Sequence, residues 1–163
     1  MACNLTSGFT LGCRDSVGGL KEVYIAEFDS ITYGSVTAGV ISTETGDFFK
    51  YELPAQTAQF TETFTGSIEN QTGFYSTELV IVLPKLTASV RNELKLLAQN
   101  KCAIIAVDRN GNKWILGYEN GCYMTTGTST SGTAMGDLNG MTLTFTALET
   151  SPAFSYSGSI SVA

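Results

Sequence analysis

Two β-type runs separated by an Asn-Gly pair constrain the fold of this chain more than any other feature. Residues 102–118 contain an apolar run, the turn Asp-Arg-Asn-Gly-Asn and a second run. Asn-Gly between two such runs is a strong hairpin signal, because both residues accept the positive φ of a type I′ turn. A strictly alternating strand follows at residues 141–147. The region is therefore predicted to be sheet that carries a long Gly/Thr/Ser-rich loop over residues 125–140.

The remaining strands are predicted from runs that end at turn residues. Strands are expected at residues 21–28, 48–53, 59–68 and 74–83, with a weaker β region at residues 31–41. The third and fourth of these form a long hairpin, because only the polar turn 69–73 separates them. Residues 79–83 are all apolar, which predicts a strand end that is buried on both faces.

One helix is predicted at residues 87–99. Thr87 is its expected N-cap and Asn100 its expected terminator. An apolar stripe recurs at helical spacing and consists of Leu86, Val90, Leu94 and Leu97. A helix that covers one face of the sheet explains this stripe, and a partner-binding helix is the alternative.

These elements predict one mainly β domain over residues 1–163. We expect an antiparallel β-sandwich or barrel with one flanking α-helix. Residues 1–20 are rich in Gly, Ser and Cys and are interpreted as an irregular N-terminal arm. Residues 151–163 form either a last edge strand or a tail.

The composition argues against most enzymatic chemistry. The chain has no histidine, which is the commonest general base and metal ligand. Charged residues make up 15%, against roughly 25% in ordinary domains. Either much of the surface is hidden in an assembly, since interface cores are poor in charge, or it consists of Thr, Ser and Gly. The net charge of −6 and the lack of a Lys/Arg patch disfavour tight binding of nucleic-acid phosphates.

The four cysteines do not indicate a metal site. Cys3, Cys13, Cys102 and Cys122 form no C-x-x-C pair, and no histidine can complete a zinc set. Cys3 and Cys13 flank a short segment and are candidates for a disulfide. The N-terminus lacks a basic start followed by a long apolar run, so no signal peptide is expected and free thiols are the default.

A partial calcium-loop pattern overlaps the hairpin turn. Four residues occupy positions one, three, five and twelve of that pattern, namely Asp108, Asn110, Asn112 and Glu119. Position six is Lys113 where the pattern requires glycine, and the flanks are predicted strands. A hairpin turn therefore explains these residues better.

Other motifs are equally weak. Gly127 and Gly132 have the spacing of a phosphate loop, but Thr133 stands where the lysine is required. Two carboxylate pairs are candidates for facing each other across strands, Glu62 with Glu78 and Asp108 with Glu119. Trp114 is interpreted as a core or interface anchor in preference to a sugar platform. No catalytic, cofactor-binding or metal residue is assigned, and no cofactor is expected.

The order of these features resembles that of bacteriophage tail tube proteins of the siphophage type. The helix at residues 87–100, the hairpin at 103–118 and the Gly/Thr-rich segment with its strand at 121–147 carry the resemblance. The N-terminal segments 3–6 and 13–19 are also similar to small virion proteins of tailed phages.

The resemblance implies a structural protein of the virion tail that is assembled in the host cytoplasm. Its subunits would form hexameric rings that stack into a hollow tube, through which DNA leaves the capsid without specific binding. Inner sheets of neighbouring subunits would join into one barrel. The implied partners are further copies and other tail proteins, with no membrane. The alternatives are another ring-forming virion protein (tail terminator, collar or head decoration) or a small ligand-binding β-barrel.

Within this family framework, the loops 69–73 and 125–140 and the N-terminal arm are expected to contact other subunits. The tube lumen is expected to be net negative, because repeated lysines would hold DNA phosphates. The acidic candidates for the lumen are Glu22, Glu27, Glu62 and Glu78, whereas Lys21, Lys50 and Lys113 are expected to lie mostly elsewhere.

Overall fold

The computed structural model describes residues 3–163 and is mainly β, with 47% strand and 9% helix. The strands are β1 (Leu20–Glu27), β2 (Thr32–Tyr33), β3 (Val40–Ile41), β4 (Glu44–Thr45), β5 (Phe49–Glu52), β6 (Gln59–Ser67), β7 (Thr72–Pro84), β8 (Cys102–Asp108), β9 (Lys113–Leu116), β10 (Tyr123–Thr130), β11 (Gly140–Glu149) and β12 (Phe154–Tyr156). A 3₁₀ turn, η1 (Phe28–Ser30), follows β1, and the helix is α1 (Ala88–Gln99). The predicted class, a β-sandwich with a single helix, is confirmed.

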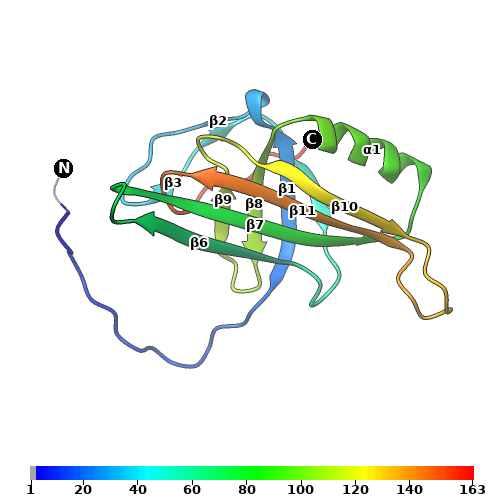
Figure 1. The fold of residues 1–163 in the computed structure, drawn as a ribbon, viewed down its shortest axis with the longest axis horizontal. Coiled ribbons are helices and arrows are strands. Elements are labelled where there is room, and N and C mark those ends of the chain that lie inside the picture. The colour runs from blue at the N-terminus through cyan, green and yellow to red at the C-terminus, as the bar shows by residue number, and fades with distance from the viewer. Residues whose placement is uncertain (1–2) are drawn as a thin grey trace.

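Two sheets pack face to face and their strands cross steeply (Figure 1). The six-stranded sheet has the order β3-β12-β9-β8-β1-β5, and the four-stranded sheet has the order β10-β11-β7-β6. A short third sheet pairs β2 with β4. The four-stranded sheet is antiparallel throughout, and the long predicted hairpin supplies two of its strands.

The six-stranded sheet is buried on both faces at its centre. On β1, Val23 and Ile25 belong to the core shared with the four-stranded sheet, whereas Tyr24 and Ala26 belong to a second core on the opposite face. The strand predicted at residues 21–28 is therefore confirmed, and its side chains alternate between the two cores. The second core also includes Phe48, so the loops between β1 and β5 cover the sheet's other face.

The helix α1 lies along one side of the sandwich, next to both sheets (Figure 1). The Thr87 side chain accepts a hydrogen bond from the Val90 N–H at 3.4 Å, and the Asn100 N–H donates to the Leu96 carbonyl at 3.1 Å, so both predicted caps are confirmed. The predicted stripe packs against the main core, although none of the helix side chains is fully buried.

The predicted type I′ turn is wrong, although the hairpin itself is confirmed. Within the turn at residues 108–112, Gly111 has a positive φ of 88°, whereas Asn110, which a type I′ turn would also require to be positive, does not. The Asp108 carboxylate accepts hydrogen bonds from the N–H groups of Asn110 and Asn112, each at 2.9 Å. An aspartate that caps its own turn in this way favours a longer connection than the two-residue loop.

The predicted loop at residues 125–140 is wrong over its first part. Residues 125–130 continue β10, and only residues 131–139 form the connection to β11. Threonine explains the difference, because it is β-branched and fits a pleated surface even in a stretch that looks too polar to pack.

Two further predictions need correction near the sheet ends. In residues 79–83, Leu79, Ile81 and Leu83 are buried, but Val80 and Val82 are only half-buried on the opposite face, so this strand end is not buried on both faces. Residues 151–163 are predicted to form an edge strand or a tail. Instead, residues 154–156 form β12, which lies inside the six-stranded sheet, between β9 and the two-residue β3.

Leu94→Ala is expected to lower the free energy of unfolding by about 1–2 kcal/mol, because Leu94 is only half-buried. Phe145→Ala, at a side chain 1% exposed, is the matched comparison and is expected to cost about 3–5 kcal/mol. Urea unfolding of the two variants measures the difference. An equal loss for both would contradict the peripheral position of the helix.

Candidate assembly surface

Threonine is the commonest residue on the outer face of the four-stranded sheet, which also carries the exposed side chains of Phe74, Tyr123 and Leu148. Its residues alternate along each strand with the buried residues of the core, and the strand register places them side by side. The outward positions include Thr61, Thr63 and Thr65 on β6, Ser76, Glu78, Val80 and Val82 on β7, Thr126, Thr128 and Thr130 on β10, and Thr142, Thr144 and Thr146 on β11. We call this set the threonine face.

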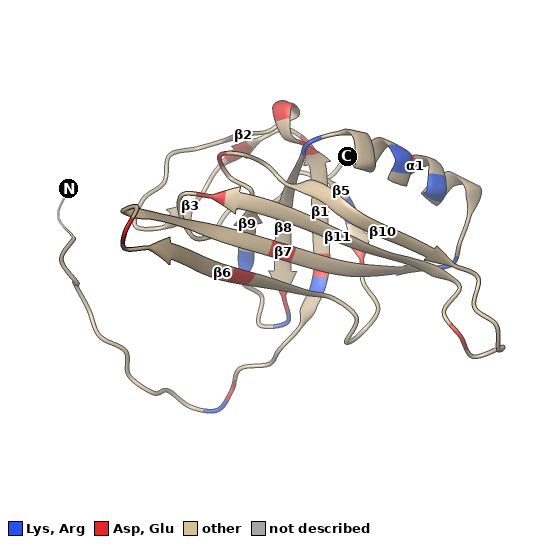
Figure 2. Ribbon diagram, viewed as in Figure 1, with Lys and Arg blue, Asp and Glu red and all other residues tan. Residues whose placement is uncertain are grey.

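The four strands of this sheet contain no Lys or Arg, and two of their three carboxylates serve the structure (Figure 2). Glu62 points inward and accepts hydrogen bonds from the Ala153 N–H at 2.7 Å and the Thr77 hydroxyl at 3.4 Å. Glu149 is 7% exposed and accepts from the backbone N–H groups that follow β9. Glu78 is therefore the one charged side chain of the threonine face.

Glu149 fixes the turn between β9 and β10. Its carboxylate accepts from the N–H of Glu119 at 3.2 Å and of Asn120 at 2.9 Å. Burial raises the pKa of Glu149, and the two backbone donors offset this only in part. Alternation along residues 59–68 already places Glu62 on the inward face with Phe60, but the hydrogen-bond partners of Glu62 and Glu149 could not be predicted from the sequence.

The sheet ends at two long strands, β6 and β10. Within residues 3–163 no strand pairs with the outer edge of either. Because all three pairings between β10, β11, β7 and β6 are antiparallel, the two edge strands run in opposite directions. Neither contains the lysine or proline that commonly protects a sheet edge, although β10 has a bulge between Met124 and Thr126 and α1 packs beside β10.

Both ends of this sheet carry exposed apolar residues. At the β6–β7 turn, the Phe64 ring lies over Gly66 and Gly73, where a Cβ at Gly73 would come within 2.8 Å of it. Phe64 nevertheless remains 60% exposed, and Ile68 is 89% exposed. At the opposite end, the 131–139 loop presents a fully exposed Met135.

The 131–139 loop has an internal anchor. The Asp137 carboxylate accepts hydrogen bonds from the N–H groups of Thr133 at 3.0 Å and Ala134 at 2.8 Å. These two bonds lower the pKa of Asp137. The loop therefore has a defined shape without any contact from a partner.

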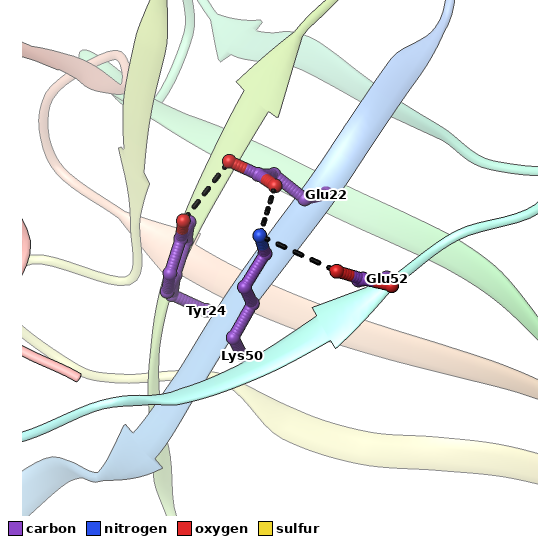
Figure 3. Close-up of polar contacts among 4 residues, drawn as sticks. All are labelled: Glu22, Tyr24, Lys50 and Glu52. Carbon is purple, nitrogen blue, oxygen red and sulfur yellow. Dashed lines mark hydrogen bonds and ion pairs between the residues drawn. The ribbon is translucent and has the colours of Figure 1, made fainter. Parts of the chain in front are cut away.

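The lysines of the candidate list all lie on the six-stranded sheet, at β1, β5 and β9. Lys50 bridges Glu22 at 2.9 Å and Glu52 at 3.5 Å, and the Tyr24 hydroxyl donates to Glu22 at 2.9 Å (Figure 3). Burial acts to raise the pKa of Glu22, but the bonds from Lys50 and Tyr24 outweigh it and the pKa is lowered. The bond to Glu22 raises the pKa of Lys50.

The predicted carboxylate pairs are not brought together. Glu62 pairs with Thr77 and Glu78 with Thr61, so the two glutamates lie on opposite faces of the sheet. Glu119 follows the end of β9, far along the hairpin from Asp108, and accepts from the Thr150 hydroxyl at 2.9 Å. Glu22 and Glu27 lie on the six-stranded sheet, which leaves Glu78 as the one acidic candidate on the threonine face.

Three residues of the partial calcium pattern, Asp108, Asn110 and Asn112, hold the hairpin turn together. Asp108 also accepts from the Trp114 indole at 3.5 Å, and the Lys113 ammonium donates to the Gly158 carbonyl at 2.7 Å. Trp114 is half-buried against the main core.

The two glycines of the phosphate-loop pattern lie in different elements, Gly127 in β10 and Gly132 in the loop after it. Across the described residues, no group of three or more His, Cys, Asp or Glu side chains is placed to hold a metal ion.

The cysteines fall into two pairs with different environments. Cys102 and Cys122 are buried and face each other through two backbone hydrogen bonds of 2.8 Å. Burial raises the pKa of Cys102 to about 11 and raises that of Cys122 further. Cys3 and Cys13 are exposed and unbonded in the structure.

Comparison with protein-family models, curated proteins and solved structures found no match to this chain. In residues 3–163, no helix has the length and apolar character needed to cross a membrane. The geometry of the four-stranded sheet is therefore the main guide to the function of the chain.

In the reduced protein, two thiols are expected to react fast with a disulfide reagent and two are expected to react slowly. Thiolates react with disulfide reagents, so Cys3 and Cys13 should react at once, whereas burial and raised pKa values protect Cys102 and Cys122. A time course with an aromatic disulfide reagent, with and without denaturant, measures this. Four fast thiols in the folded protein would contradict the burial of the second pair.

Proposed function

We propose that this chain is a virion structural protein that self-assembles into hexameric rings stacked as a tail tube, a conduit for DNA ejection. The proposal assigns no catalytic step, cofactor or metal to the chain. Its partners are further copies of itself and other tail proteins, and the assembled protein resides in the virion tail.

The two open edges of the four-stranded sheet support the proposal most directly. In a ring, neighbouring copies are related by rotation, so β6 of one copy lies beside β10 of the next. Because these strands run in opposite directions, the new pair is antiparallel and continues the pattern of the sheet. A closed ring leaves no unpaired edge, so the outer edges of β6 and β10 would become contacts between copies.

The threonine face suits the wall of a DNA conduit. Six such sheets would make a barrel wider than the roughly 16–18-stranded porins that leave an aqueous channel. These strands have no Lys or Arg, so they would place no positive charge beside the DNA phosphates. Glu78 of each copy would add to a ring of negative charge around the lumen. DNA would then slide past a polar, weakly negative surface.

The alternatives fit the same observations less fully. The interior of the sandwich is filled by large side chains such as Phe145 and Ile81, and the larger hollows lie at the surface, which disfavours a ligand-binding barrel. A tail terminator, collar or head-decoration protein would share the ring but not long stacks of rings. The presence or absence of tubes separates these possibilities.

The double substitution Thr61→Lys, Thr63→Lys is expected to prevent assembly. Both threonines are exposed on β6, so the fold should tolerate the change to within about 0.5 kcal/mol. Lysines on an edge strand oppose pairing, because a neighbouring strand would restrict and partly desolvate their long side chains. Light scattering after size exclusion, with negative-stain images, measures the assembly.

Ser35→Lys, Thr37→Lys is the matched control, since it adds the same charge at exposed positions between β2 and β3. Assembly should persist in the control and be lost in the β6 variant. Native protein that remains monomeric at high concentration, or rings formed by the β6 variant, would contradict pairing of β6 with β10 of the next copy.

Glu78→Lys is expected to make assembled tubes retain DNA. Each ring would then carry repeated lysines toward the lumen, and phosphate contacts give affinity that falls steeply with salt. Co-sedimentation of short duplex DNA with tubes at several salt concentrations measures this, with Glu52→Lys on the six-stranded sheet as the control. Equal retention by the two variants would place Glu78 outside the lumen.

A further inference from the structure

An apolar groove runs beside α1 where the helix meets the six-stranded sheet. It consists of two adjoining hollows of about 160 and 140 Å³, which share Tyr51, Glu93 and Leu97 as lining residues. Phe49 and Leu96 line the larger hollow and are 61% and 46% exposed. Large apolar side chains that stay this exposed around a hollow mark a surface suited to an apolar segment.

The sheet edge beside this groove is partly open. β5 is the last strand of the six-stranded sheet, and within residues 3–163 its outer side is met by one parallel bridge, between Val162 and Phe48, the residue just before β5. Val162 itself is 52% exposed. A further extended segment therefore has both apolar hollows and backbone hydrogen-bonding groups available to it.

The N-terminal arm is the one long segment of the described chain whose apolar residues lack any cover. Every residue from Cys3 to Gly19 is exposed, and Leu5, Phe9 and Leu11 are 98%, 89% and 93% exposed. Residues 3–13 carry no charged side chain. Phe9 and Leu11 stand two residues apart, which in an extended segment points both to the same side.

The arm leaves the body away from its own groove. Val17 exchanges two hydrogen bonds of 2.9 Å with Asn110, in the turn between β8 and β9, and Gly19 accepts from the Arg109 N–H. The groove lies at the opposite end of β1, beside Ile25 and Glu27. In Figure 1 the arm sweeps to the left, whereas α1 lies at the upper right.

We infer that the apolar part of the arm, residues 3–13, occupies the α1 groove of a second copy, with Phe9 and Leu11 against Leu96 and Phe49. An extended stretch of residues 3–16 spans roughly 45 Å, enough to cross to a neighbour. The contact joins different elements from the β6–β10 joint. It presupposes self-association, as the proposed function does, but needs neither a closed ring nor the threonine face.

Disulfide trapping between two full-length variants tests this contact. Both carry Cys3→Ser and Cys13→Ser; one adds Phe9→Cys and the other Leu96→Cys. After mixing and mild oxidation, peptide mass spectrometry quantifies the bond between residues 9 and 96. The matched control replaces Leu96→Cys with Ala98→Cys, an exposed helix position that lines none of the hollows.

The 9–96 bond is expected to form at least about tenfold faster than the 9–98 bond, because a seated arm raises the effective concentration of the paired thiols. Equal rates would overturn the inference. The mass of the native protein by light scattering is measured separately. A fast 9–96 bond in a protein that forms no rings would support the arm contact and contradict the proposed ring. Rings in a protein whose 9–96 and 9–98 bonds form at equal rates would support the ring and contradict the arm contact.

Discussion

The four-stranded sheet is buried on one face only, and the rest of the molecule follows from that constraint. Leu79 and Ile81 on β7, with Leu143 and Phe145 on β11, seat the sheet on the six-stranded sheet with side chains at most 1% exposed. The alternate positions then have to face outward, and they carry threonine, serine and valine. A face with β-branched residues and almost no charge keeps the strands in register while leaving little to repel a neighbour.

The two edge strands of the same sheet are the observation that favours self-association. An isolated protein usually protects long edge strands with lysine, proline or a covering element. β6 and β10 are covered by no strand of the described chain, and lysine and proline are absent from both. The charges of the molecule are concentrated elsewhere, including the Glu22–Lys50 pair on the six-stranded sheet. Low charge, open edges and opposite strand directions together favour association by strand pairing.

Much of the fold could be predicted from local patterns. The hairpin of β6 and β7, the capped helix and strand β1 follow from the sequence, because each depends on side chains close together in the chain. The turn at Asp108 was not, since the choice between turn types depended on whether the carboxylate would accept from two N–H groups. The extent of β10 was missed because a polar threonine run was interpreted as loop.

The site was less accessible to sequence reasoning. Alternating threonines were visible at residues 61–65 and 142–146, yet their common face emerges only once the register joins four strands. Alternation places Glu62 inward with Phe60, but its partner, the Ala153 N–H, lies 91 residues away along the chain and could not be predicted. Of the acidic lumen candidates, Glu78 alone faces outward on this sheet, because it alternates with the buried Thr77 and Leu79.

Amide hydrogen exchange, compared between dilute and concentrated protein, tests the central claim most directly. If β6 and β10 join neighbouring copies, their edge amides should become protected as the mass rises, while amides of the exposed loop between β2 and β3 stay unchanged. Association that leaves exchange at both edges unaltered would contradict the account, as would protection confined to the six-stranded sheet.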